Sequence, residues 1–266
     1  MRTSRLDEQY QVYLNRVLGM TRLEHYQSQW SLIQSSPKFS PNAAGVWEPK
    51  AFPGYTVVTP PGSEDSANPR FYRALADLQQ KLADLLPSPF GLLLPPASFH
   101  LTLADLIWDG AYTQATQQDA AYETKLQNCI QETLSQQSAT VSTGNPILLQ
   151  GLGLMVMTRA IGICLAPHTE ADYDRLIGVR RSVYQNPNLF ALGIEQQYHF
   201  TAHITLGYFG HLPEQVDTVA LSQALETLNK EFLENCPEFT LDRVELRKFD
   251  NMHTYRREAT WPVLQF

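Results

Sequence analysis

The sequence predicts an α+β fold of two similar lobes, each a strand–helix–strand unit, related by a pseudo-twofold axis around a central cleft. Residues 198–209 alternate between apolar and polar side chains, and residues 98–105 form a near-copy about a hundred positions earlier. The alternation and the β-branched and aromatic content indicate strands rather than helices. Each copy is also preceded by a strand and an amphipathic helix, which indicates a duplication.

In the first unit, a short strand over residues 55–59 ends at Pro60-Pro61-Gly62. Asn68 and Pro69 then provide an N-cap and a first-turn proline for a helix whose apolar residues recur at helical spacing until Pro87. The strand that carries His100 follows. The middle of the first strand lies 43 positions before this histidine.

The second unit repeats this order, and the middle of its first strand lies 40 positions before His203. The same periodicities assign the remaining elements. The predicted helices cover residues 121–137, run from Thr169 to before Pro187, and begin at Pro213. The predicted strands cover residues 146–157, 160–165, 239–249 and 258–264. Residues 110–119 form a polar stretch.

The predicted domains are a helical amino-terminal extension, residues 1–45, and a bilobal domain, residues 46–266. Lobe one covers about residues 54–110 and lobe two about residues 160–210, with linking and closing elements around them. Within the extension, residues 35–42 read as a linker because they contain two prolines.

Composition narrows the class of protein. The chain has 266 residues, 43% hydrophobic content and a net charge of −7, so it can bury a full core but is poorly suited to coat long nucleic acid. No apolar run resembles a signal peptide or a membrane span, so we expect a cytoplasmic protein without a membrane partner. The three cysteines form no CxxC pair, so neither a disulfide framework nor a thiolate metal site is expected.

Both repeated strands present the same two polar side chains on one face. Residues two apart on a strand share a face, so His100 lies beside Thr102 and His203 beside Thr205, while the apolar residues between them face a core. A single His-x-Thr is usually an ordinary hydrogen-bonded pair. Two such pairs at matched positions of a duplication favour a functional site instead.

Other kinds of site are less well supported. His199 and His203 would form a zinc pair on a helix, but on a strand they lie about 13 Å apart along the chain and cannot chelate one ion. Asp105 and Asp109 near His100 suggest a Ser-His-Asp triad, yet no Gly-x-Ser-x-Gly elbow accompanies them. We therefore expect no metal and no cofactor.

Further side chains are candidates for nucleotide contacts, although core packing or surface solvation explains each of them as well. Aromatic faces can stack on a base, and cations can bind phosphate. The aromatic candidates are Tyr55, Trp108 and Tyr208, and the cationic candidates are Arg159, Arg247 and Lys248. His199 and Thr201, on the same predicted face as His203, would line an extended cleft or its rim.

The runs His100-Leu-Thr-Leu and His203-Ile-Thr-Leu resemble the paired signatures of the 2H phosphoesterase superfamily, which includes RNA 2′,3′-cyclic phosphodiesterases and 2′,5′-phosphodiesterases. The run Phe52-Pro-Gly-Tyr-Thr-Val-Val-Thr-Pro-Pro further resembles a little-characterised bacterial branch. The resemblance covers about residues 54–266 and leaves the extension outside.

This resemblance implies a metal-independent phosphodiesterase with antiparallel sheets lining its cleft. His100 and His203 would act as general acid and base, and Thr102 and Thr205 would hold the phosphate oxygens. The substrate would be a cyclic phosphate or 2′,5′-type phosphodiester in a nucleotide or a short RNA end. The alternative is a non-catalytic module that binds a nucleotide in the same cleft. The sequence leaves open which histidine is the acid, and whether the protein self-associates.

Overall fold

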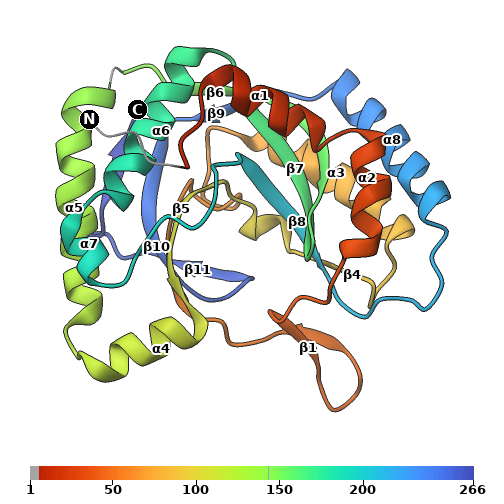
Figure 1. The fold of residues 1–266 in the computed structure, drawn as a ribbon, viewed down its shortest axis with the longest axis horizontal. Coiled ribbons are helices and arrows are strands. Elements are labelled where there is room, and N and C mark those ends of the chain that lie inside the picture. Colours follow the sequence, from red (N-terminus) through yellow and green to blue (C-terminus); the bar gives the residue numbers. More distant parts are fainter. Residues whose placement is uncertain (1–5, 143) are drawn as a thin grey trace.

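The computed structural model describes residues 6–142 and 144–266 and shows an α+β fold (Figure 1). Its helices are α1 (Tyr10–Gly19), α2 (Leu23–Gln29), α3 (Pro69–Leu85), α4 (Asp109–Gln118), α5 (Tyr122–Val141), α6 (Glu170–Tyr184), α7 (Pro187–Ala191) and α8 (Thr218–Glu234), with 3₁₀ turns η1 (Trp30–Leu32) and η2 (Pro96–Ser98). Its strands are β1 (Phe39–Pro41), β2 (Trp47–Pro49), β3 (Gly54–Val58), β4 (Gly91–Leu93), β5 (Thr102–Trp108), β6 (Ile147–Val156), β7 (Ala160–Pro167), β8 (His203–Phe209), β9 (Phe239–Leu241), β10 (Arg243–Asn251), β11 (Thr254–Arg256) and β12 (Val263–Gln265).

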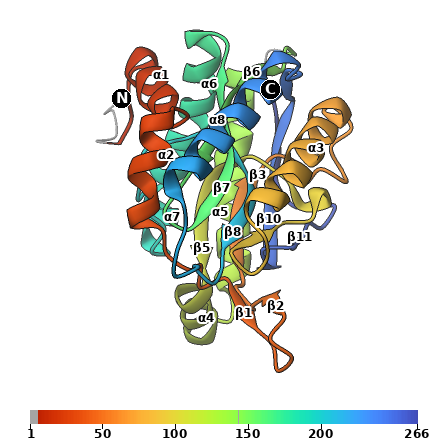
Figure 2. The ribbon, with the colours of Figure 1, turned by 90° about the vertical axis from the view of Figure 1, so that its right-hand side faces the viewer.

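Two antiparallel sheets form the body of the protein. The first sheet has the order β11-β10-β3-β5, with β12 also paired to β10, and the second has the order β4-β8-β7-β6-β9. Helices α5 and α6 pack together on the side of the first sheet, and α2, α3 and α8 lie over the second (Figures 1 and 2). The β1–β2 hairpin projects from this body. The predicted α+β class with antiparallel sheets is confirmed.

The two predicted units occupy corresponding places in the two sheets. In the first unit β3 pairs with β5 around α3, and in the second β7 pairs with β8 around α6. The sheets meet where Leu101 forms an antiparallel bridge with Ile204. These are the residues between the histidine and the threonine of each motif, so the bridge joins the two motifs at their centres.

Several element boundaries differ from the predictions. The polar stretch at 110–119 forms α4, because a short helix with few apolar residues lacks a clear periodic signal. The last helix begins at Thr218 rather than Pro213, since Asp217 accepts a hydrogen bond from the Ala220 amide and caps it. Residues 239–249 do not form one strand but divide into β9 and β10, which belong to different sheets. The predicted Thr169 cap is confirmed by its bond from the Asp172 amide.

The amino-terminal segment packs along one edge of the molecule. Helix α1 contacts β7 and α6, and α2 contacts β6 and α8 (Figure 2). Within the described ranges 6–142 and 144–266, no helix combines the length and apolar character needed to cross a membrane.

Each motif strand contains a β-bulge just after its threonine. The strand registers leave Leu103 of β5 and Leu206 of β8 without a directly paired partner. A bulge shifts the alternation by one residue, so the next outward side chain comes three positions after the threonine. Asp105 and Tyr208 therefore turn back to the side that carries His100 and His203.

A side chain from the helix of each unit forms a hydrogen bond with the bulge of the other unit. Gln79, the eleventh residue of α3, donates from Nε2 to the Leu206 carbonyl at 2.8 Å and to the Leu94 carbonyl at 2.7 Å. Arg180, the eleventh residue of α6, donates from Nη1 to the Leu103 carbonyl. Both donors are buried, so each bulge carbonyl accepts a hydrogen bond from the helix of the other unit, and the Leu206 carbonyl also accepts one from the Leu94 amide.

The Gln79 contacts predict a loss of stability in Gln79→Met, which keeps the size of the side chain but removes the donor. The buried Leu94 carbonyl would lose its bond from Gln79, at a cost of about 1–3 kcal/mol in the free energy of unfolding. Urea denaturation measures this change. The control is Gln80→Met on the exposed side of the same helix, and equal losses in both variants would contradict the role given to Gln79.

Candidate active site

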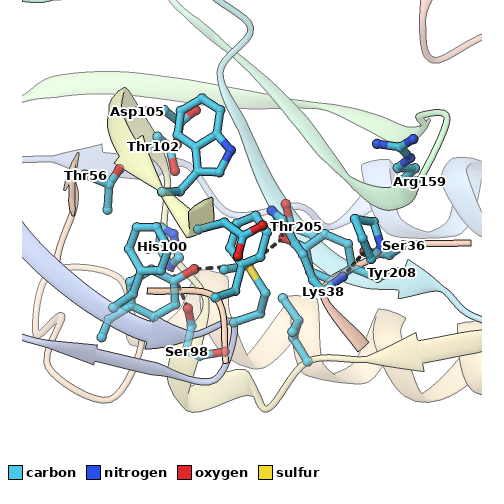
Figure 3. A pocket seen from close by; sticks show the side chains of 18 of the residues that line it. Ser36, Lys38, Thr56, Ser98, His100, Thr102, Asp105, Arg159, Thr205 and Tyr208 are labelled. Atoms are coloured by element: carbon cyan, nitrogen blue, oxygen red, sulfur yellow. Dashed lines mark hydrogen bonds between the residues drawn. The ribbon is translucent and has the colours of Figure 1, made fainter. Parts of the chain in front are cut away.

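A cavity of about 520 Å³ lies where the two motif strands meet (Figure 3). All four site residues predicted from the sequence line it, namely His100, Thr102, His203 and Thr205. Their side chains are partly exposed, whereas the intervening Leu101 and Ile204 are fully buried, as the alternation predicts.

The bridge fixes how these four residues face one another. Because the strands run antiparallel through Leu101 and Ile204, the register places His100 opposite Thr205 and Thr102 opposite His203. Directly opposed side chains in such a pair have Cβ atoms about 4.5–5.5 Å apart, and diagonal neighbours about 7–8 Å apart. The two histidines are therefore diagonal neighbours across the cavity, each faced by a threonine.

Both imidazoles are oriented by the same kind of hydrogen bond. Nδ1 of His100 donates to the Ser98 carbonyl at 2.7 Å, and Nδ1 of His203 donates to the Thr201 carbonyl at 2.8 Å. A carbonyl oxygen only accepts, so the proton of each neutral ring lies on Nδ1. Nε2 of each ring is then the nitrogen that can exchange a proton with a bound substrate.

The electrostatic surroundings of the two histidines differ. Burial lowers the pKa of His100, the Ser98 bond opposes this change, and the nearby His203 adds a smaller lowering effect, so that the pKa is about 4. Burial also lowers the pKa of His203, but its bond to Thr201 and the neighbouring Asp105 carboxyl oppose this change. Burial raises the pKa of Asp105 in turn. The Asp105 carboxylate thus favours protonation of His203. No carboxylate is among the groups that shift the pKa of His100.

Lys38 also lines the cavity, although no sequence pattern indicated it. It lies in what reads as a linker, yet its ammonium group donates to the Tyr208 hydroxyl at 3.2 Å and lies 5.2 Å from the Phe52 ring centroid. Among the described residues it has no carboxylate partner. Figure 3 shows Lys38 beside Tyr208 on one side of the cavity.

Asp105, considered from the sequence only as part of a Ser-His-Asp triad, lines the cavity, and so does Tyr255, which no sequence pattern indicated. Strict alternation from Thr102 places Asp105 on the buried face, but the bulge at Leu103 brings it into the cavity. Tyr255, in the last third of the chain, packs its ring 4.3 Å from the His100 ring centroid. Only the tertiary structure brings this tyrosine to the motif.

The other candidates divide into two groups. Trp108, Tyr208 and Arg159 line the cavity. Tyr55 is fully buried, Arg247 pairs with Glu64 and Glu245, and Lys248 pairs with Glu123. The second group does not line the cavity, because burial or paired carboxylates hold these side chains elsewhere, so the structural explanation holds for these three.

His199, which the alternation places on the same face as His203, does not line the cavity. Nδ1 of His199 donates to the Leu6 carbonyl at 2.9 Å, outside the cavity. Residues 6–142 and 144–266 contain no cluster of three or more His, Cys, Asp or Glu side chains arranged to hold a metal ion.

Part of the chain matches a known family model. Residues 38–150 match the 2H-phosphodiesterase family model, which is described as a domain of unknown function (DUF1868). The resemblance to the 2H phosphoesterases is confirmed. No curated protein sequence matches the chain significantly.

Several solved structures match the chain, all at low sequence identity. A conserved protein of unknown function from Agrobacterium tumefaciens, ATU0111, has a TM-score of 0.60 at 15% identity, over 87% of this chain and 97% of that chain. Escherichia coli LigT, complexed with 3′-AMP, has a TM-score of 0.38 at 12% identity, over 80% and 93%. Usb1 from Kluyveromyces marxianus has a TM-score of 0.39 at 13% identity, over 81% and 97%. The likeness to the Agrobacterium protein shows that the two share a fold.

The lowered pKa of His100 predicts a loss of stability in mild acid. In the unfolded chain this pKa is about 6.5, so between pH 6.5 and its folded value of about 4 the unfolded state binds the proton more tightly. The free energy of unfolding should therefore fall as the pH drops through this window. His100→Asn should fall less steeply when urea denaturation is repeated across it, with His211→Asn as the control for an exposed histidine. Equal slopes for wild type and His100→Asn would contradict the prediction.

Proposed function

We propose that the protein is a metal-independent phosphodiesterase that hydrolyses a cyclic phosphate or a 2′,5′-type phosphodiester in a nucleotide or short RNA end. His100 and His203 would be its general acid and base, and Thr102 and Thr205 would bind the non-bridging phosphate oxygens. The observation that carries this proposal is the convergence of all four side chains in one cavity, at the bridge between the two units.

The diagonal arrangement suits an in-line displacement. Water attacks phosphorus as one imidazole takes its proton, and the bond from phosphorus to the leaving ribose oxygen breaks as the other imidazole protonates that oxygen. The attacking and leaving oxygens lie on opposite sides of phosphorus, so the base and the acid must do so as well. Threonine hydroxyls between them donate hydrogen bonds to the phosphate without adding negative charge.

We assign His100 as the base and His203 as the acid for this hydrolytic step. A base must be neutral before the reaction, and the pKa of His100, lowered to about 4, keeps its ring neutral near pH 7. An acid must carry a proton, and the Asp105 carboxyl favours the protonated form of His203. The two histidines therefore differ in their roles because their neighbouring groups differ, although their motifs are the same.

The cavity also favours a small anionic substrate. Lys38 and Arg159 supply positive charge within a chain whose net charge is −7, so the attraction for phosphate is local. Trp108 and Tyr208 offer aromatic faces to a base in a cavity within the usual size range of small-ligand sites.

The activity is tested with 2′,3′-cyclic nucleotides, 3′,5′-cyclic nucleotides, cyclic dinucleotides and 2′,5′-linked dinucleotides in EDTA. We expect turnover to survive the chelator and to fall about 10²-fold or more in His100→Ala and in His203→Ala, because each removes one proton-transfer group. His211→Ala is the control at an exposed site. Nucleotide binding in calorimetry without turnover would favour the binding module, and loss of turnover in EDTA would contradict metal independence.

The acid and base assignment is tested with Asp105→Asn. Loss of this carboxylate should lower the pKa of His203, so the alkaline limb of kcat/KM against pH, where the acid loses its proton, should move to lower pH. Asp109→Asn is a matched control, since Asp109 also lines the cavity and its φ of 51° is readily adopted by asparagine. A shift of the acidic limb alone would reverse the assignment.

A further inference from the structure

Helix α1 lies before the duplicated units but binds the segment that leads into His203. The guanidinium of Arg16 donates from Nη1 to Thr201 Oγ1 at 2.8 Å and from Nη2 to the Phe200 carbonyl at 2.5 Å. Its Nε edge forms a two-bonded pair with the Glu8 carboxylate, at 2.9 Å from Nε to Oε1 and 2.7 Å from Nη2 to Oε2. Both edges of the planar fork are therefore engaged, which fixes its orientation.

Tyr13, on the same helix, adds a second attachment. Its hydroxyl donates to the Leu165 carbonyl of β7 at 3.0 Å and accepts from the Ala202 amide at 3.4 Å. The side chain is fully buried. The hydroxyl thus connects β7 to the residue immediately before His203.

The segment that α1 holds has no regular structure of its own. Residues 194–202 belong to neither a helix nor a strand, so side-chain contacts must restrain much of their backbone. Thr201 is held at both ends, since its hydroxyl accepts from Arg16 and its carbonyl accepts from Nδ1 of His203. The hydrogen bond that orients the His203 ring is therefore accepted by Thr201, the residue that Arg16 of α1 binds.

His100 is supported in a different way. Its acceptor, the Ser98 carbonyl, belongs to the turn η2, in which the Ser98 amide and hydroxyl both donate to the Pro95 carbonyl at 2.8 Å. All of these contacts lie within five residues of His100. His203 instead depends on a residue 185 positions from Thr201.

We propose that α1 is the positioning element for His203, and that Arg16 acts through Thr201 to keep Nδ1 protonated and Nε2 directed to the substrate. Arg16 is a positioning residue and does not itself touch the substrate. This inference rests on the proposed function for its kinetic consequence, whereas its structural consequence is independent of turnover.

The test compares Arg16→Ala with Arg181→Ala. Arg181 also binds the amino-terminal segment, through a 2.6 Å bond from Nε to Asp7, but it forms no hydrogen bond or ion pair with residues 200–202. In nitrogen-resolved NMR of the histidine rings, Arg16→Ala should shift His203 from the Nδ1-protonated tautomer to a mixture and leave His100 unchanged. With the substrate found for the wild type, kcat should fall about tenfold to a hundredfold. KM should stay nearly constant, because the contacts that bind the nucleobase and the phosphate remain. Arg181→Ala should change neither the tautomer nor kcat.

An unchanged His203 tautomer in Arg16→Ala would overturn the proposal, and so would equal effects of the two variants. If Arg16→Ala does not fold, as judged by circular dichroism, Tyr13→Phe makes the same comparison by removing one hydroxyl. If the wild type shows no turnover, the proposed function fails, but the NMR comparison still decides whether α1 positions His203.

Discussion

The antiparallel bridge between Leu101 and Ile204 sets the geometry of the cavity. These two residues are fully buried at the junction of the sheets, and each is flanked by a histidine on one side and a threonine on the other. Pairing at this point alone places each histidine opposite the other motif's threonine. A shift of one residue in either strand would turn its histidine into the core. The bulges that follow, and the buried Gln79 and Arg180 that bind their carbonyls, keep this register from slipping.

The two similar units supply two equivalent imidazoles, but the proposed general acid–base chemistry needs two different ones. The difference comes from residues outside the shared motif. Equivalent bulges deliver Asp105 in one lobe and Tyr208 in the other, so a carboxyl is available on one side of the cavity only. The Tyr255 ring covers His100, whereas α1 supports the backbone next to His203. The repeated motifs thus supply the two imidazoles, and residues outside the motifs make their surroundings different.

The sequence predicted the parts of the structure that depend on local periodicity. The strand alternation identified the duplicated units and placed His100 and His203 with their threonines on one face. It could not predict Asp105 in the cavity, because a bulge is set by pairing with a neighbouring strand and reverses the side on which later residues lie. Lys38 was hidden because a proline-flanked segment carries no signal of what lies beside it. The sequence left the role of Arg247 open because its carboxylate partners, Glu64 and Glu245, come from two separate segments.

The sheets do not follow the order of the units in the chain. Strand β4 precedes the first motif but is the edge strand of the second sheet, next to β8. Strand β10 follows the second unit but lies inside the first sheet, next to β3. Each half of the chain therefore completes the sheet of the other. A polypeptide severed between the units would yield two fragments with mutually missing strands, which could form a native cleft only by reassociation and not as independent modules.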